Sequence, residues 1–300
     1  MVKKNRWGKK YKDKRDWKSY NKRLVNRGMF YINPVFLDTW LEETKAMNHG
    51  KVGQPYLYPK SMIEFLSVLH TKNFDYRGLE GIARGLSNRL GNFPIISFSQ
   101  IRKRIIELKY SFSPKKNNLL VAVDGSGLKV SNRGDWIRKQ WKIERGWIKV
   151  VIMGDEEGNI VDIRIGNENL DEKASGRGMV RKNHNNIDKF MGDGLHDCKD
   201  NFKLLDQLGI EPVIKIRKNA STKRKGCLAR QKEVLTYKEL GYKKWAKKKQ
   251  YGKRWPASEG IFSGVKGIFG ENIRSHKTRY MYHEAKAKFW AYQKIKDLGA

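Results

Sequence analysis

Residues 119–127 read Leu-Leu-Val-Ala-Val-Asp-Gly-Ser-Gly, and this stretch decides the class of fold that the sequence predicts. A short apolar run followed at once by glycines is consistent with a buried strand. Asp124 follows the run directly, so we expect a carboxylate where the strand ends. In α/β sheets, ligands collect at the carboxyl ends of the strands. The stretch therefore predicts both a core strand and a candidate functional residue.

Further strand signals follow along the chain. Apolar runs at 147–153 and 160–165 flank the turn Glu157-Gly158-Asn159, which predicts an antiparallel meander. After it, helical and strand signals alternate: a helix over about 170–182, a strand at 187–191, a helix through 202–208 and a strand at 213–216. This alternation is typical of an α/β core.

The composition favours a folded protein with a polyanionic partner. The 300 residues are 39% hydrophobic and include nine Trp, thirteen Tyr and twelve Phe, enough to bury a sizeable core. Lys and Arg number 64 against 31 acidic residues, so the formal net charge is +33. No apolar run is long enough to span a membrane, so we expect no membrane partner and a cytoplasmic, nucleoid-associated protein. Charge by itself does not distinguish DNA from RNA.

Upstream of the strands, apolar residues recur at helical spacing between Asn33 and Leu108. Two predicted helices follow Pro34 and Pro59, a third stops near Gly91, and a fourth is capped by Ser99. Short helices in series are similar to a helix-turn-helix domain.

The fourth predicted helix carries three basic residues, Arg102, Lys103 and Arg104, off its apolar stripe. A recognition helix presents side chains in this way to the DNA major groove. The alternative is a solvated basic face without a specific role. In a chain of this charge we favour the DNA-binding interpretation.

Two changes of composition divide the chain. Residues 1–28 carry 12 Lys or Arg against two acidic residues, which fits either an arm that follows DNA phosphates or a solvated tail. A polar, helix-breaking stretch begins at Ser113 and Pro114. We therefore expect a basic arm at 1–28, a helical DNA-binding domain at 29–113 and an α/β domain at 114–300.

A second carboxylate, Asp193, repeats the arrangement of Asp124, because it follows a strand signal and precedes a glycine. Two carboxylates at the ends of neighbouring parallel strands would share a cation. Asp-Gly is also a common turn signal, and for one such motif the turn is the better interpretation. For two of them in a basic protein, the turn and the functional site are evenly balanced.

The third carboxylate is Glu259, three residues after Pro256 at the start of a predicted helix. At about 100° per residue, Glu259, Ser263 and Lys266 fall on one edge of the apolar stripe, so acid and base would face one site. On this helix alone, a first-turn Glu favoured by the helix dipole and an ordinary surface Lys explain the pattern better. The stripe consists of Ile261, Phe262, Val265, Ile268 and Phe269.

The order of these segments resembles the DDE transposases of bacterial and archaeal insertion sequences, and the resemblance covers most of the chain. It rests on a series of motifs rather than on any single one. The pieces are Asp-Gly-Ser-Gly-Leu-Lys-Val at 124–130, Trp136 with Arg145 and Trp147, Gly-Asp-Gly-Leu-His-Asp at 192–197, Ile-Arg-Lys-Asn-Ala at 216–220, Tyr-Gly-Lys-Arg-Trp at 251–255, and Glu259 with Phe262, Ser263 and Lys266. The resemblance implies an α/β fold with an RNase H-like mixed-sheet catalytic core at 114–300, preceded by an all-α, helix-turn-helix-like DNA-binding domain.

The resemblance also implies a metal site. Asp124, Asp193 and Glu259 match the family's metal-binding carboxylates, which would hold two Mg²⁺ or Mn²⁺ ions per active site. Hard divalent cations prefer carboxylate oxygens. In-line cleavage of a phosphodiester benefits from two such ions. The predicted cofactors and the predicted reaction therefore agree.

A basic signature surrounds the glutamate in this family, and Tyr251, Arg254 and Lys266 match it. The resemblance implies that these side chains contact DNA phosphates and that Lys266 belongs to the catalytic set. Between Arg254 and Glu259 there are four residues, where the family pattern has three.

Several other polar or aromatic residues have a structural interpretation that we favour. Trp136, Trp141 and Trp147 would stack on a displaced base or, more simply, pack in the core. His196 and Asp197 lie beside Asp193 in the sequence and are left out of the catalytic set. Cys198 and Cys227 lack the spacing of a zinc site and are expected to be reduced.

The resemblance implies a transposase that binds double-stranded DNA, both the terminal inverted repeats of its element and the target DNA. Pairing of two ends implies a homodimer, and the absence of a P-loop pattern predicts no ATP dependence. One alternative is a non-catalytic, sequence-specific DNA-binding protein, as a decayed transposase would be. Another is an RNA-binding protein, which explains the charge and leaves the three carboxylate segments unexplained.

Overall fold

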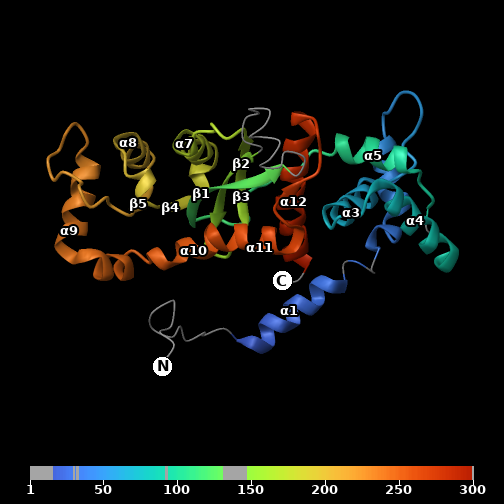
Figure 1. Cartoon of the computed structure of the whole chain (residues 1–300), viewed down its shortest axis with the longest axis horizontal. Helices are drawn as coiled ribbons and strands as arrows, with labels where there is room; N and C mark the ends of the chain where they lie inside the picture. The colour runs from blue at the N-terminus through green and yellow to red at the C-terminus, as the bar shows by residue number, and fades with distance from the viewer. Residues whose placement is uncertain (1–15, 30, 32–33, 92–93, 131–146, 299–300) are drawn as a thin grey trace, which may run out of the picture.

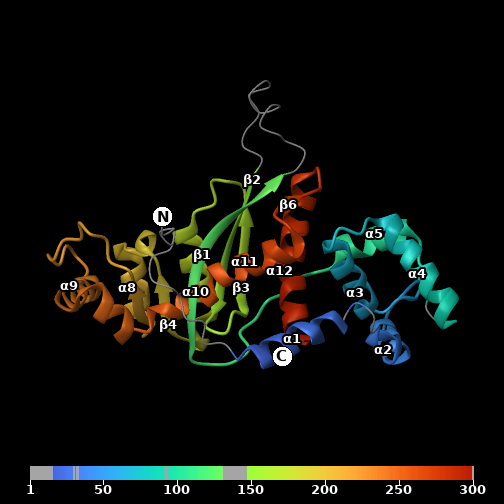
Figure 2. The same ribbon diagram turned by 60° about the horizontal axis from the view of Figure 1, so that its bottom comes forward.

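A mixed β-sheet forms the centre of the molecule in the computed structural model, which describes residues 16–29, 31, 34–91, 94–130 and 147–298 (Figures 1 and 2). Its path of strands is β3-β2-β1-β4-β5, and β6 pairs with the far end of β1. β1 pairs antiparallel with β2 and parallel with β4. The strands are β1 (Leu119–Val130), β2 (Trp147–Asp155), β3 (Ile160–Gly166), β4 (Ile187–Gly192), β5 (Glu211–Ile214) and β6 (Asn272–Ile273). The predicted RNase H-like, mixed-sheet α/β fold is confirmed.

Strand β1 runs well past the first carboxylate. The prediction that Asp124 ends its strand is wrong, because β1 continues to Val130 and Asp124 pairs with Ile152 of β2. The prediction missed this because the two glycines that follow look like a turn. In the sheet they make room for neighbouring side chains: a Cβ on Gly125 would lie 2.4 Å from Glu172 Oε2, and one on Gly127 would lie 2.9 Å from Trp147 Cε3.

Helices cover both faces of the sheet. Successive side chains of β1 point to opposite faces and contact different helices. Val121 and Val123 point to one face and pack in a core with α7 (Glu172–Asn183) and α8 (Lys199–Gln207). Ala122 points to the other face, where it packs with residues of α9 (Leu228–Lys248) and α10 (Arg254–Ala257). On the same face, α11 (Glu259–Phe269) and α12 (Thr278–Leu298) cover β2 and β3. Asp124 follows Ala122 by two residues and therefore faces α10 and α11.

The helical region upstream of the sheet has its own apolar core, which includes Met62, Leu66, Leu79 and Ile101. Its helices are η1 (Val35–Leu37), α2 (Trp40–Asn48), α3 (Lys60–Thr71), α4 (Tyr76–Leu90) and α5 (Phe98–Glu107). The cap of α5 is Ser97, whose hydroxyl accepts from the N–H of Gln100, so the prediction of Ser99 as cap is wrong by two residues.

Other boundaries also differ from the sequence prediction. The first predicted helix, which follows Pro34, is split into η1 and α2, and Leu41 of α2 is 81% exposed. β5 begins at Glu211 and ends at Ile214, two residues earlier than predicted. Short 3-10 turns occur at η2 (His184–Asn186), η3 (Gly194–His196) and η4 (Tyr251–Lys253). None of the helices in the described part of the chain has the length and apolar character to cross a membrane.

Helix α12 joins the two parts of the molecule. It contacts α3 of the helical region as well as α11 and β3 of the sheet core. Helix α1 (Trp17–Met29) also contacts α12 and lies across its C-terminal end in Figure 2, although no residue of α1 is buried. The basic segment that precedes it, residues 1–15, lies outside the described residues.

Candidate active site

The two predicted aspartates meet at one place on the sheet. β1 and β4 are parallel neighbours whose pairing ends at Ala122 and Met191, and Asp124 and Asp193 each follow two residues later. Burial raises the pKa of Asp124, and the negative charges of Glu172 and Asp193 add to the increase. Asp193 Oδ1 accepts from the N–H of Leu195 at 2.8 Å, which fixes the loop after β4. Two carboxylates at this point repel one another and favour a bound cation.

Arg254 connects the first aspartate to the glutamate. Its Nη1 lies 3.6 Å from Asp124 Oδ2, and its Nη2 donates a hydrogen bond to Glu259 Oε1. The side chain of Arg254 is 17% exposed, whereas that of Glu259 is 48% exposed. The additional residue between Arg254 and Glu259 does not prevent this contact, because α10 and α11 are separate helices that meet at Ser258.

Tyr251 fixes the segment before α10 to the end of β4. Its hydroxyl donates to the carbonyl oxygen of Gly192 at 3.2 Å, next to Asp193. The ring packs against Trp245 at 5.1 Å between centroids, and Arg254 lies over it at 5.8 Å. Burial raises the pKa of Tyr251 to about 12, so the hydroxyl is protonated at neutral pH and remains a donor. Tyr251 therefore places Arg254 beside the carboxylates.

Lys266 does not join this group. Its Nζ lies 3.7 Å from Glu271 Oε2, and Lys129 of β1 forms a second salt bridge to Glu271. Lys266 follows Glu259 by seven residues, or about 10 Å along the helix axis. The structure thus brings together four of the predicted residues, Asp124, Asp193, Arg254 and Glu259, with Tyr251 beside them, and places Lys266 with a different carboxylate.

Sequence reasoning missed Glu172, the first residue of α7. The side chain of Glu172 is 11% exposed and fills the space left by Gly125, next to Asp124. Its Oε1 lies 3.6 Å from His196 Nε2, and its Oε2 lies 3.7 Å from Lys149 Nζ. Burial opposes ionisation of Glu172, but His196 and Lys149 outweigh it and hold its pKa below the usual value. The sequence marks Glu172 only as a first-turn residue after the N-cap Asp171.

The basic residues predicted on α5 point in different directions, as consecutive residues of a helix must. Lys103 is exposed to solvent. Arg104 is half-buried and donates to Gln100 Oε1 at 2.9 Å. Arg102 lines a pocket that α5 shares with residues 274–288. Arg102 and Lys103 are thus both accessible to solvent, whereas Arg104 would have to leave Gln100 to face a DNA duplex.

The other residues considered in the sequence analysis either have structural contacts or lie outside the described residues. Asp197 is buried, and Arg230 donates to its two oxygens at 2.6 and 3.1 Å. Trp147 begins β2 and packs against Gly127. Trp136, Trp141 and Arg145 lie outside the described residues. Cys198 and Cys227 are both free thiols.

Comparison with protein families identifies the family to which the chain belongs. A family model described as a transposase DDE domain matches residues 115–293, and a second model with the same description matches residues 25–133. The chain belongs to the DDE transposase family. It is a transposase of the insertion-sequence type, and Asp124, Asp193 and Glu259 all lie within the residues that the first model matches.

DDE transposases generally use divalent metal ions, and the side chains at this site have the chemistry to bind them. Carboxylate oxygens are the preferred ligands of Mg²⁺. Burial is the main cause of the raised pKa of Asp124, and a divalent cation would counteract it by favouring the ionised carboxylate. Among the described residues, however, no three acidic, histidine or cysteine side chains lie close enough together to hold a metal ion. Glu259 is turned toward Arg254 instead.

Proposed function

We propose that this transposase binds the terminal inverted repeats of its own element and catalyses metal-dependent DNA strand cleavage and strand transfer. The observation that carries the proposal is that Asp124 and Asp193 occupy matching positions just beyond the pairing of β1 with β4, with Glu259 linked to Asp124 through Arg254. Asp124, Asp193 and Glu259 would hold two Mg²⁺ or Mn²⁺ ions. When bound, the ions activate the attacking oxygen and stabilise the leaving oxygen of the phosphodiester.

The side chains of the chain itself would position the DNA. Arg254 carries a guanidinium that is already between two carboxylates, and it would exchange Glu259 for a phosphate oxygen of the DNA. Tyr251 would hold the α10 segment in place through its bond to Gly192. Water attacks first, and the 3′-hydroxyl that it releases attacks the target strand, so no protein nucleophile is needed. Lys266 would contact a phosphate further along α11.

We propose the division into a basic arm at 1–28, a DNA-binding region at 29–113 and a catalytic region at 114–300. The charge supports DNA contacts in both the helical region and the catalytic region. Arg102, Lys103 and Arg104 lie on α5, and the segment from Lys215 to Arg254 carries 16 Lys or Arg against two acidic residues. Two element ends would be paired by a homodimer, and ATP is not part of the proposed reaction.

The decisive experiment is cleavage of labelled DNA that carries the element's terminal repeats, with Mg²⁺, Mn²⁺ or EDTA, by wild type and Glu259→Gln. We expect nicking at the repeat boundary that requires metal and that falls by at least about 100-fold in the variant, more than the loss of an outer-shell partner costs. Glu168→Gln, an exposed position after β3 and outside the basic segment, is the matched control and should cleave normally. Specific binding by wild type without cleavage in any metal would support the alternative, a decayed transposase that only binds DNA.

A separate prediction tests the DNA-binding face of α5. Lys103→Ala should weaken binding to the repeats and to random duplex DNA alike, because an exposed ammonium contacts phosphates rather than bases. The slope of log Kd against log salt should fall by about one unit. Titrations at several salt concentrations measure this slope. An unchanged slope would show that Lys103 does not contact the DNA.

A further inference from the structure

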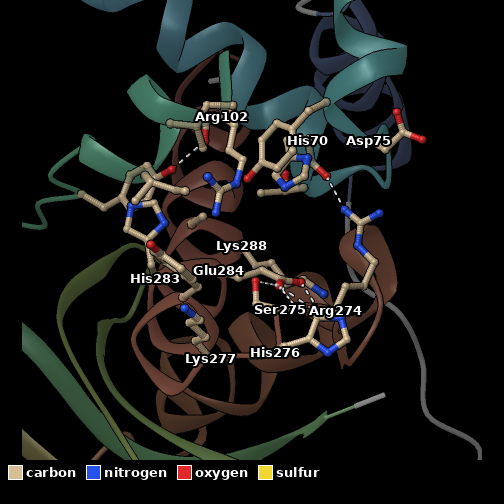
Figure 3. Close-up of a pocket in the computed structure, with 18 residues that line it drawn as sticks. His70, Asp75, Arg102, Arg274, Ser275, His276, Lys277, His283, Glu284 and Lys288 are labelled. Atoms are coloured by element: carbon tan, nitrogen blue, oxygen red, sulfur yellow. Dashed lines mark hydrogen bonds between the residues drawn. The ribbon is translucent and has the colours of Figure 1, made fainter. Parts of the chain in front are cut away.

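A second site lies where the helical region meets the C-terminal segment. A pocket of about 450 Å³ is lined by α3, α4 and α5 on one side and by residues 274–288 on the other (Figure 3). Its volume falls in the range of about 300–1,000 Å³ that is usual for small-molecule sites. None of its lining residues belongs to the carboxylate site.

The pocket has an excess of positive charge. Arg102 reaches into it from α5, and Lys277 approaches from the opposite side (Figure 3). Among the described residues, neither Arg102 nor Lys277 forms a salt bridge with a carboxylate. Each acidic residue of the lining already has partners: Glu284 accepts from Ser275 N at 2.9 Å and Ser275 Oγ at 2.7 Å, and Asp75 accepts from Gly78 N at 2.6 Å.

The charge comes from arginine and lysine rather than from histidine. Burial lowers the pKa of both His70 and His283, so each ring is neutral at pH 7. Lys288 is occupied, since its Nζ donates to the carbonyl oxygens of three residues at the end of α11 and in β6. Arg274 is occupied as well, since its guanidinium donates to two backbone carbonyl oxygens at 3.3 and 3.1 Å. Among the described cations of the lining, Arg102 and Lys277 are thus left to receive an anion.

Aromatic rings complete the lining. Tyr76 is stacked on His70 at 4.3 Å between ring centroids, and Arg102 lies 5.7 Å from the ring centroid of Tyr280. Tyr110 lies deeper and shares a hydrogen bond of 2.7 Å with Ser67. Rings beside unpaired cations are the combination that recognises a nucleobase together with its phosphate.

We propose that this junction pocket binds a nucleotide, with Arg102 and Lys277 on the phosphate and the tyrosine rings against the base. The ligand is a free mononucleotide or one nucleotide of a DNA strand, which present the same chemistry. Arg102 belongs to the helical region and Lys277 precedes α12, so a bound phosphate would tie these two parts together. The site goes beyond strand cleavage and does not depend on the three carboxylates.

The test is equilibrium dialysis of the full chain with radiolabelled deoxyadenosine monophosphate at about 0.15 M salt, where long-range attraction is screened. We expect saturable binding with one site per chain. Arg102→Gln and Lys277→Gln should each weaken binding by about tenfold or more, as expected for loss of a charge-assisted hydrogen bond. Arg89→Gln, an exposed position on α4 outside the pocket, makes the same change of charge and should bind as wild type does.

Competitors distinguish the sources of the ligand. Displacement by a short single-stranded oligonucleotide supports a nucleotide of DNA, and retention of the label against the oligonucleotide supports a free nucleotide. Equal competition by inorganic phosphate would overturn the assignment, because the site would then recognise only an anion. Binding that does not saturate, or that is the same in Arg102→Gln and Arg89→Gln, would also overturn it. Metal-dependent cleavage of repeat DNA is assayed separately, so failure here leaves the proposed activity intact.

Discussion

Replacing Asp124 by Asn should abolish DNA cleavage and leave binding to the terminal repeats intact. The substitution keeps the size of the side chain but removes a negative charge that lies beside Asp193 and 3.6 Å from Arg254. A metal ligand contributes more than its outer-shell partners, whose loss costs about 10–100-fold, so we expect a decrease of at least about 1,000-fold. Nicking of end-labelled repeat DNA in Mg²⁺ and in Mn²⁺ measures the effect, and a gel shift in EDTA measures binding.

The matched control is Asp188→Asn. Asp188 lies on β4, the strand that leads to Asp193, but its side chain is exposed near the start of that strand. The Asp188→Asn variant loses the same charge and should cleave DNA at the wild-type rate. Cleavage by Asp124→Asn within tenfold of wild type would show that this carboxylate does not hold the metal.

Replacing Gly154 by Ala should displace the helices that carry Arg254 and Glu259. Gly154 pairs with Ala122 of β1, so its missing side chain would point to the face that α10 and α11 cover. A Cβ there would lie 2.2 Å from the carbonyl oxygen of Ala257 and 2.4 Å from Ile261 Cδ1. The backbone oxygen cannot rotate away, so the helices must shift.

Overpacking of this kind typically lowers the free energy of unfolding by roughly 1–3 kcal/mol. We therefore expect a lower midpoint of urea unfolding, together with a larger loss of cleavage than of DNA binding. Gly178→Ala is the control, since a Cβ on that residue of α7 meets nothing within 4 Å. It should leave the stability unchanged or raise it. Wild-type stability and cleavage in Gly154→Ala would contradict the close contact between β2 and α10.

Local patterns of apolar residues were sufficient to predict most of the strands and helices. Short apolar runs predicted five of the strands, β1 to β5, and helical patterns predicted α3, α4, α5, α7, α8 and α11. These predictions succeeded because the burial of one face imposes its period on the sequence. Ser97 shows the limit, since two serines in the same turn offer the same cap, and which one forms it depends on where the chain enters the helix.

The sequence by itself determined the class of fold, the order of the three carboxylates and the excess of basic residues, because these are properties of neighbouring residues or of composition. Tertiary structure alone decided what each carboxylate touches. Glu172 lies beside Gly125, Arg254 lies between Asp124 and Glu259, and Lys266 pairs with Glu271. The contacts of Glu172 with Gly125 and of Arg254 with Asp124 join residues far apart in the chain, so they depend on strand register and on how closely α7, α10 and α11 approach the sheet. Strand register and the distance between helix and sheet have no local signal in the sequence, because both arise from packing between elements.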